Sequence, residues 1–178
     1  MPAPLVRAAA PSDAAAIAAI YNEGIADRVA TFETRERDAA EVAAWLDDGL
    51  PFVVATLDGA VAGFARVSPY SDRRVYSGVG EHGVYVARAV RGHGVGRVLL
   101  AELCAAAEAA GLYKLTSSVF ADNAVSIAAH VAAGFEVVGV QRRHGRLDGE
   151  WRDCVLVERV LGEAARAAPA PTDDRTAR

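Results

Sequence analysis

The fold of this chain can be inferred outward from one run, "AVRGHGVGRVLLAEL", Ala89–Leu103. Its glycines, Gly92, Gly94 and Gly96, stand beside positive charge and come just before an apolar helical pattern. The run before them, "EHGVYVA", Glu81–Ala87, has the aromatic and β-branched residues typical of a strand. A strand, a glycine-rich turn and a helix form an anion site, because the first amides of a helix have no partner inside it and glycine lets a phosphate approach the backbone.

The glycine loop matches neither of the two common nucleotide-binding patterns. "RGHGVG", Arg91–Gly96, lacks the lysine of a P-loop, and "GHGVGR" lacks the last glycine of the dinucleotide fingerprint. The next strand, Tyr113–Phe120, does not end in the acidic residue that a dinucleotide site uses. A tight turn that needs glycine for its geometry alone is the alternative to phosphate binding, and the loop by itself favours neither.

Elsewhere the chain alternates strand and helix patterns. Strands are predicted over residues 5–9, 81–87, 113–120, 135–145 and 151–161, and a hairpin over 52–67 around Asp58-Gly59. Helices are predicted over 14–25, 39–48, 96–111 and 124–133, with a loop at 28–34 and a polar excursion at 68–80. This order predicts an α/β fold, a mixed sheet covered by helices, in one domain over residues 1–162. Residues 163–178 are rich in Ala, Pro and charge and are expected to form a disordered tail.

Composition narrows the function classes. The chain has 178 residues, of which 52% are hydrophobic and 24% charged, as expected of one soluble domain. The net charge is −4 without a basic block, so neither nucleic acid nor a membrane surface is an expected partner. No apolar run has the length of a membrane span or a signal peptide, and Cys104 and Cys154 form no CxxC, which favours a reduced, cytoplasmic protein. The four histidines lack metal-ligand spacing, so no metal is expected.

The motifs resemble those of the GNAT family of N-acetyltransferases. "RGHGVG" is similar to the [QR]xxGx[GA] acyl-CoA pyrophosphate loop of that family, and "DNAVSIAAHVAAGFEVVG", Asp122–Gly139, is similar to its later block. The blocks "AAIYNEGI", "ATFET", "GEHGVYV" and "HGRLDGEWRD" further resemble the phosphinothricin acetyltransferase branch, which includes arsinothricin acetyltransferases. The resemblance spans Leu5–Leu161 and implies a single-domain GNAT fold with a central mixed, mostly antiparallel twisted sheet flanked by helices.

The resemblance implies acetyl-CoA as the acetyl donor. In the family the pantetheine arm pairs with the strand before the glycine loop, and the amide of Val86 would donate to the thioester carbonyl. Asn123 and Ser126 occupy positions that contact the CoA arm in the family. Both could instead cap a helix, and the two roles can coexist. The residues implied to bind the cofactor are Val84, Tyr85, Val86, Arg91, Gly92, His93, Gly94, Val95, Gly96, Arg97, Asn123 and Ser126.

Two residues are catalytic candidates. In the branch that this chain resembles, a glutamate at the position of Glu81 is the general base, and a carboxylate can take the proton that an ammonium acceptor must lose. A solvated carboxylate at a strand end is the alternative. His130 lies seven residues after Asn123, on the same helix face, where relatives place a residue proposed to protonate the departing sulfur. A structural histidine explains that position equally well.

The acceptor is expected to be a small amine that resembles an amino acid. Arg73, Arg74 and Tyr76 lie in the polar excursion, where an arginine fork suits a carboxylate or phosphinate, and Phe32 would add apolar contact. Solvated loop arginines are the alternative, and Ser77 stands where relatives often have arginine. The expected activity is acetylation of phosphinothricin, arsinothricin or methionine sulfoximine in detoxification or resistance. A protein or peptide N-acetyltransferase and a non-catalytic acyl-CoA-binding module are the alternatives, and homodimers are common in the family.

Overall fold

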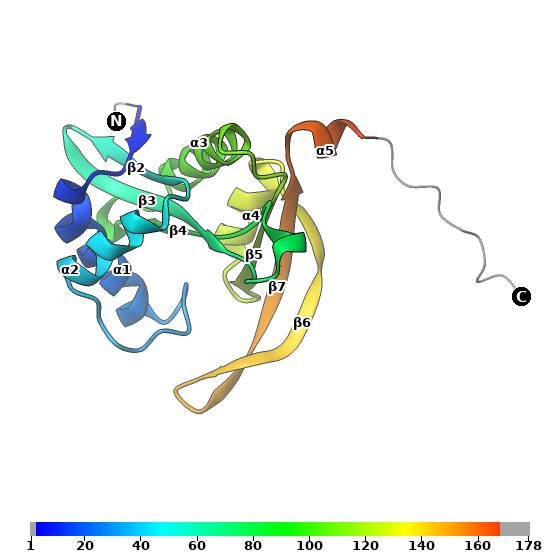
Figure 1. The fold of residues 1–178 in the computed structure, drawn as a ribbon. Helices are drawn as coiled ribbons and strands as arrows, with labels where there is room; N and C mark the ends of the chain where they lie inside the picture. The colour runs from blue at the N-terminus through cyan, green and yellow to red at the C-terminus, as the bar shows by residue number, and fades with distance from the viewer. Residues whose placement is uncertain (1–2, 168–178) are drawn as a thin grey trace, which may run out of the picture.

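One seven-stranded sheet organises the computed structural model, which describes residues 3–167 (Figure 1). The strands lie in the order β1-β2-β3-β4-β5-β7-β6, and only β4 and β5 are parallel neighbours. Their bounds are β1 Leu5–Ala8, β2 Phe52–Leu57, β3 Ala60–Pro69, β4 Val79–Val86, β5 Lys114–Phe120, β6 Glu136–Leu147 and β7 Glu150–Val160. The predicted mixed, mostly antiparallel sheet is confirmed.

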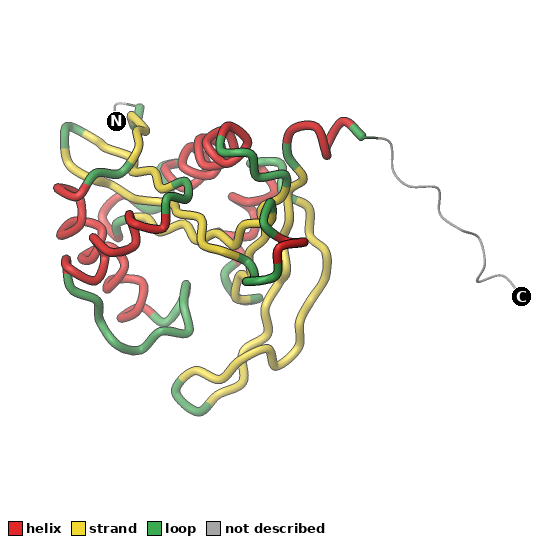
Figure 2. The backbone as a smooth tube through the Cα atoms, in the orientation of Figure 1, coloured by secondary structure: helices red, strands yellow, loops and turns green. Residues whose placement is uncertain are grey.

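Helices cover both faces of the sheet (Figure 2). They are α1 Ala14–Asp27, α2 Ala39–Ala44, α3 Val95–Ala109, α4 Ala124–Ala132 and α5 Gly162–Arg166, with 3₁₀ turns at Pro11–Asp13, Trp45–Asp48, Arg74–Tyr76 and Arg88–Val90. On one face, Ile17 of α1 packs in a core with Val54 and Phe64 of the sheet. On the other face, Leu99 of α3 packs in a core with Leu115.

Local chemistry explains several element boundaries. Asp38 accepts a hydrogen bond from the Glu41 amide at 2.8 Å and so caps α2. Asp58 and Gly59 both have positive φ, 49° and 81°, as a tight hairpin turn requires. The expectation that the tail begins at residue 163 is wrong for its first residues: Gly162–Arg166 form α5, with an acidic residue in its first turn. Residues 168–178 of the expected tail lie outside the described part of the chain.

The sheet opens between its two parallel strands. Three residue pairs join β4 to β5: Val79 with Lys114, Gly80 with Leu115, and Glu81 with Thr116. Beyond those pairs β4 continues to Val86 along β3, and β5 continues to Phe120 along β7. The facing edges therefore diverge after Glu81, and we call this opening the split.

Candidate active site

The edge of β4 presents backbone amides to the split. The Ala87 amide donates to the Ala62 carbonyl at 2.9 Å, so these two residues form a hydrogen-bonded pair between β3 and β4. Partners in an antiparallel ladder alternate between bonded and non-bonded pairs, so Val84 and Val86 turn their N–H and C=O groups away from β3 and toward β5. Apart from the Val86 carbonyl, which accepts from Nε of Arg91, these are the groups that an extended molecule in the split would meet.

Tyr85 does not belong to that set. Tyr85 lies between Val84 and Val86 in the strand, so its backbone N–H and C=O groups face β3, where Tyr85 pairs with Phe64. Its ring lies between those of Tyr21 and Phe64, with centroid distances of 4.9 and 5.0 Å. The expectation that Tyr85 binds the cofactor is corrected to a packing role, because strand alternation sends its side chain into the core beneath α1.

The glycine loop forms an open cradle at the start of α3. Gly92 and Gly94 have φ of 79° and 80°, a region that L side chains rarely adopt, and a Cβ at either position would meet nothing within 4 Å. The amides of Arg97 and Val98 bond to the Gly94 carbonyl, so those of Val95 and Gly96 precede the bonded turns. The cradle lies at the mouth of the split, next to the end of β4. Gly96 is so close to Val86, the last residue of β4, that a Cβ on Gly96 would be 3.6 Å from the Val86 side chain.

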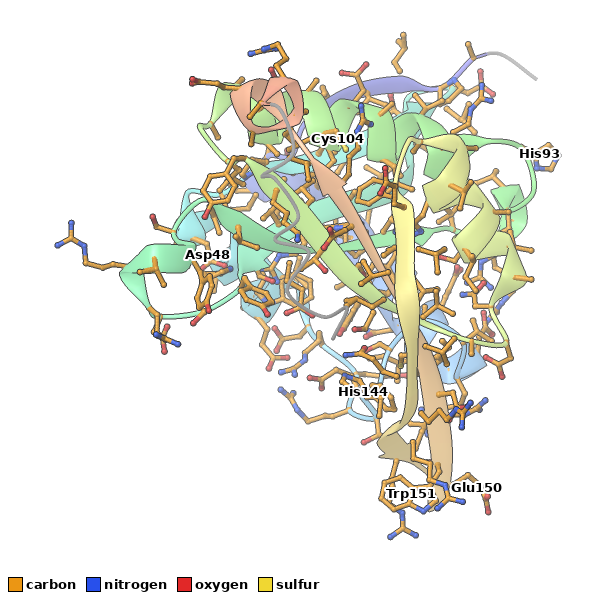
Figure 3. The ribbon with its side chains drawn as sticks, turned by 90° about the vertical axis from the view of Figure 1, so that its right-hand side faces the viewer. Asp48, His93, Cys104, His144, Glu150 and Trp151 are labelled. Atoms are coloured by element: carbon orange, nitrogen blue, oxygen red, sulfur yellow. The ribbon has the colours of Figure 1, made fainter. Side chains whose placement is uncertain are left out.

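The side chains of the loop differ in where they point. His93 projects from the edge of the molecule (Figure 3), and its Nδ1 lies 2.9 Å from the carbonyl of Arg91. Arg97 is exposed on the first turn of α3. Arg91, predicted to hold a pyrophosphate, instead donates from Nε to the Val86 carbonyl at 3.0 Å and from Nη1 to Asp27 at 2.6 Å.

Two carboxylates of α1 that the sequence analysis missed tie this loop in place. Asp27 accepts hydrogen bonds from Arg88 and Arg91, and these bonds lower the pKa of its carboxyl group. Glu23 accepts the backbone amide of Arg88 at 2.6 Å. Each partner is more than sixty residues away in sequence, so no local pattern marks Glu23 or Asp27.

Glu81 stands at the vertex of the split. It is the last β4 residue paired on both sides, with Ser68 of β3 and Thr116 of β5, and its side chain is exposed. Because side chains alternate along a strand, Glu81 points to the same face as Tyr85, the face covered by α1. A carboxylate in this place can reach a molecule whose end lies at the vertex.

His130 lies on the opposite face and is enclosed by protein. It is 1% exposed; its Nε2 is 3.0 Å from Nε2 of His82, and its Nδ1 is 2.7 Å from the carbonyl oxygen of Ser126. Both ring nitrogens are therefore engaged within the chain. The structure does not bring Glu81 and His130 together on one face of β4, and it adds His82, which the sequence analysis did not single out.

Asn123 connects α4 to the segment that follows α1. Its Oδ1 accepts the Ser126 amide at 3.1 Å, which confirms the capping role, and its Nδ2 donates to the Val29 carbonyl at 2.9 Å. Neither contact occupies the backbone edge of β4. Asn123 and Ser126 thus lie at the first turn of α4, where the side chain of Ser126 is half-buried.

The segment between α1 and α2, residues 28–38, crosses from the β4 side to the β5 side of the split. Arg28 forms an ion pair of 2.7 Å with Asp148 in the β6–β7 turn. The Phe32 ring packs at 4.7 Å from Phe120 and so closely on Gly145 that a Cβ there would lie 2.6 Å from it. We call residues 28–34 the bridge. Phe32, predicted to contact the acceptor, is held in this bridge.

The remaining predicted acceptor residues lie at the other end of β4. The guanidinium of Arg73 stacks at 5.4 Å over the ring of Tyr76, and both belong to an exposed turn that also contains Arg74. A pocket of about 220 Å³ beside them is lined by Tyr76 but not by Arg73, Arg74 or Phe32. The four residues are therefore not gathered in one pocket.

Residues 3–167 contain neither a group of metal ligands nor a helix able to cross a membrane. His, Cys, Asp and Glu side chains nowhere gather there in a group of three or more able to hold a metal ion. None of the helices in that range combines the length and apolar character needed to cross a bilayer.

The split, with a glycine cradle and helix amides at its mouth, defines a class of α/β protein suited to hold an extended, diphosphate-bearing molecule between two strands. The sequence profile of the acetyltransferase (GNAT) family matches residues 17–135. The chain therefore belongs to the GNAT family of acetyltransferases.

Known relatives agree with this assignment. The chain is 33% identical to an L-methionine sulfoximine/L-methionine sulfone acetyltransferase of Pseudomonas paraeruginosa, over 92% of this chain and 98% of the relative. A phosphinothricin acetyltransferase from Sinorhizobium meliloti in complex with AcCoA superposes with a TM-score of 0.86 at 33% identity, covering 95% of this chain and 94% of that one. A ribosomal-protein-alanine N-acetyltransferase from Brucella melitensis superposes with a TM-score of 0.84 at 35% identity, covering 88% and 99%.

Proposed function

We propose that this enzyme transfers an acetyl group from acetyl-CoA to the amino group of a small amino-acid-like acceptor, such as phosphinothricin, arsinothricin or methionine sulfoximine. The observation that carries the proposal is the open edge of β4 beside the glycine cradle. The relatives named above for methionine sulfoximine and phosphinothricin support the acceptor class. Detoxification of such amino-acid analogues, in the cytoplasm, is the corresponding biological role.

The residues at the split fit acetyl-CoA, which supplies the acetyl group as a thioester. The amides of Val84 and Val86 would pair with its extended arm, and that of Val86 suits a carbonyl oxygen that gains charge, a contact worth roughly 3 kcal/mol. The amides of Val95 and Gly96, with Gly92 and Gly94 open toward solvent, would receive the diphosphate. Arg97 and His93 lie at the rim of this cradle.

Glu81 is proposed as the general base. An amine must lose a proton to act as a nucleophile, and the exposed carboxylate of Glu81 stands at the vertex, where the acetyl end would lie. Arg91 would act through the loop rather than by a free side chain, since Asp27 holds its guanidinium. His130 stays a proposed catalytic group for protonation of the departing sulfur; burial keeps its ring neutral, Nδ1 donates to the Ser126 carbonyl and Nε2 accepts from His82.

A small acceptor fits the surroundings of the vertex. The bridge crosses the split through Arg28 and Phe32, which leaves less room there for a folded protein substrate. Arg73 and Arg74 offer exposed positive charge for an acceptor's carboxylate or phosphinate. The similarity to a ribosomal-protein-alanine N-acetyltransferase makes a peptide amino terminus the second candidate acceptor.

We also propose that the protein forms a homodimer through the β6–β7 hairpin. The hairpin extends away from the body of the molecule (Figure 1), and Trp151 lies near its tip (Figure 3). Val138, Val140 and Trp151 are each more than half exposed along it. A run of large apolar side chains on a sheet edge is typical of a surface that another chain covers.

The test is release of free thiol from acetyl-CoA in the presence of single amines. The panel would contain phosphinothricin, arsinothricin, methionine sulfoximine, methionine sulfone, the common amino acids and an alanine-initiated peptide. We expect turnover with one or more of the amino-acid analogues and little with the peptide. Turnover with the peptide alone would establish the second candidate, and binding of acetyl-CoA without release by any amine would leave a binding module.

A further inference from the structure

Two histidines form a buried pair where β4 and β5 separate. His82 is 4% and His130 1% exposed, and their Nε2 atoms lie 3.0 Å apart. The ring of Phe135 packs against both, with centroid distances of 4.8 and 5.2 Å. His82 directly follows Glu81, the last residue of β4 that pairs with β5. The pair therefore joins β4 to α4 at the vertex of the split.

The contacts of the pair determine which nitrogens carry hydrogen. A carbonyl oxygen can only accept, so His130 must donate from Nδ1 to Ser126, 2.7 Å away. Its Nε2 is then an acceptor in the neutral ring, and His82 must donate to it from Nε2. Burial lowers the pKa of both rings and keeps them neutral. The second nitrogen of His82, Nδ1, has no hydrogen bond of full geometry within the described residues, although the backbone of Thr116 lies close enough to offset part of the lowering of the ring's pKa.

We propose that His82 is a positioning residue, whose hydrogen bond to His130 clasps β4 to the first turn of α4 and so sets the width of the split. The connection is continuous: His82 donates to His130, which donates to the Ser126 carbonyl, in the turn that Asn123 caps. The inference rests on the proposed acetyl-CoA site, because that ligand would contact β4 on one side of the opening and α4 on the other.

The hydrogen bond between the two rings supports a role for His82 beyond packing. Burying a polar ring has a desolvation cost, so an apolar side chain would serve a purely structural position better. What His82 offers that such a side chain cannot is a donor aimed at His130.

A matched pair of substitutions tests the clasp. His82→Gln carries an amide nitrogen near the position of the imidazole Nε2 and can still donate, whereas His82→Asn is one methylene shorter and cannot reach. We expect long-range ¹⁵N NMR of the protein alone to show His130 protonated at Nδ1 in the native chain and in H82Q, and a mixture of tautomers in H82N. A native His130 protonated at Nε2 would overturn the clasp, and this measurement requires no substitution.

The second readout is binding of acetyl-CoA by calorimetry. The Kd should rise about tenfold in H82N and stay within about twofold in H82Q, as expected for one lost hydrogen bond. His144→Asn, an exposed histidine on β6, is the control and should bind as the native chain does. A folded H82N with unchanged Kd would overturn the proposed role of His82. A native chain that binds no acetyl-CoA would contradict the proposed function instead, while the NMR result would still decide whether the clasp exists.

Discussion

Asp27 at the end of α1 accepts a hydrogen bond of 2.6 Å from Nη1 of Arg91, 64 residues later, so the glycine cradle is tied to the far side of the sheet. The same carboxylate accepts from Arg88, and Arg91 also reaches the Val86 carbonyl. Asp27 therefore orients the cradle through two arginines of the loop. A rigid cradle binds a diphosphate better than a mobile one, because less conformational freedom is lost on binding.

Asp27→Asn should weaken this tie. We expect the KM for acetyl-CoA to rise by about tenfold with a smaller change in kcat, because a charge-assisted hydrogen bond to the loop is lost and binding suffers more than chemistry. Steady-state kinetics with acetyl-CoA as the varied substrate is the measurement. Asp47→Asn, an exposed aspartate of the Trp45–Asp48 turn, is the control. Equal effects of the two substitutions would show that Asp27 is an ordinary surface charge.

Glu81→Gln should remove the general base. Turnover should fall by roughly 100-fold or more while the Kd for acetyl-CoA stays nearly constant, because the amide keeps the shape of the side chain but cannot take a proton. Single-turnover rates and calorimetry separate the two effects. Glu102→Gln, on the exposed side of α3, is the matched control. Unchanged turnover would exclude Glu81 from proton transfer.

Arg73→Ala should weaken binding of an acidic acceptor. The KM for the best acceptor of the panel should rise by roughly tenfold or more, as expected for loss of a hydrogen bond to a charged group. The KM for acetyl-CoA should not change, since Arg73 lies at the opposite end of β4 from the glycine cradle. Arg166→Ala in α5 is the control. An unaltered acceptor KM would mean that Arg73 serves only as a solvated charge.

Gly145→Ala should destabilise the fold and move the bridge. The new Cβ would lie 2.6 Å from the Phe32 ring, and such overpacking costs about 1–3 kcal/mol of unfolding free energy. Urea unfolding measures the loss. Gly139→Ala on the same strand is the matched control, because a Cβ there meets nothing within 4 Å. Similar losses for both variants would show that Phe32 is not packed on Gly145.

Asp13 should make stability depend on acidic pH. Its buried carboxylate accepts from both terminal nitrogens of Arg7 at 2.6 and 2.8 Å, and these bonds hold its pKa below the ordinary value. The folded state therefore binds the proton more weakly than the unfolded state. The stabilisation is complete above the unfolded pKa of about 3.9 and is lost as the pH falls through the lower folded pKa.

Asp13→Asn tests this dependence. At pH 7 the unfolding free energy should fall by about 1–3 kcal/mol, because the charge-assisted hydrogen bonds of a buried carboxylate to a half-exposed arginine are broken. Below pH 4 the difference between native and variant chains should shrink. Urea titrations from pH 7 to pH 2 provide the measurement. A constant difference across that range would mean that the carboxylate's charge contributes nothing.

Local patterns predict the order of strands and helices and the glycine turn before α3, because a turn, a cap and a glycine at positive φ each depend on a few neighbouring residues. Contacts between distant residues were not predicted. The His82–His130 pair spans 48 positions and the Asp27–Arg91 bond 64, and no periodicity relates such residues. The motif places Tyr85 and Arg91 at the ligand because it gives residue type and order, but not which side of a strand a backbone faces or which carboxylate an arginine binds.

The opening between β4 and β5 also has a consequence for stability. The sheet consists of two half-sheets, β1–β4 and β5–β7, whose ladders meet at only three residue pairs among the described strands. An extended molecule laid along the exposed amides completes the missing rungs, so its binding free energy adds to that of the fold. At a hundred times its Kd such a ligand contributes about 2.7 kcal/mol. The concentration of acetyl-CoA would then affect the unfolding free energy of the protein as well as its rate of turnover.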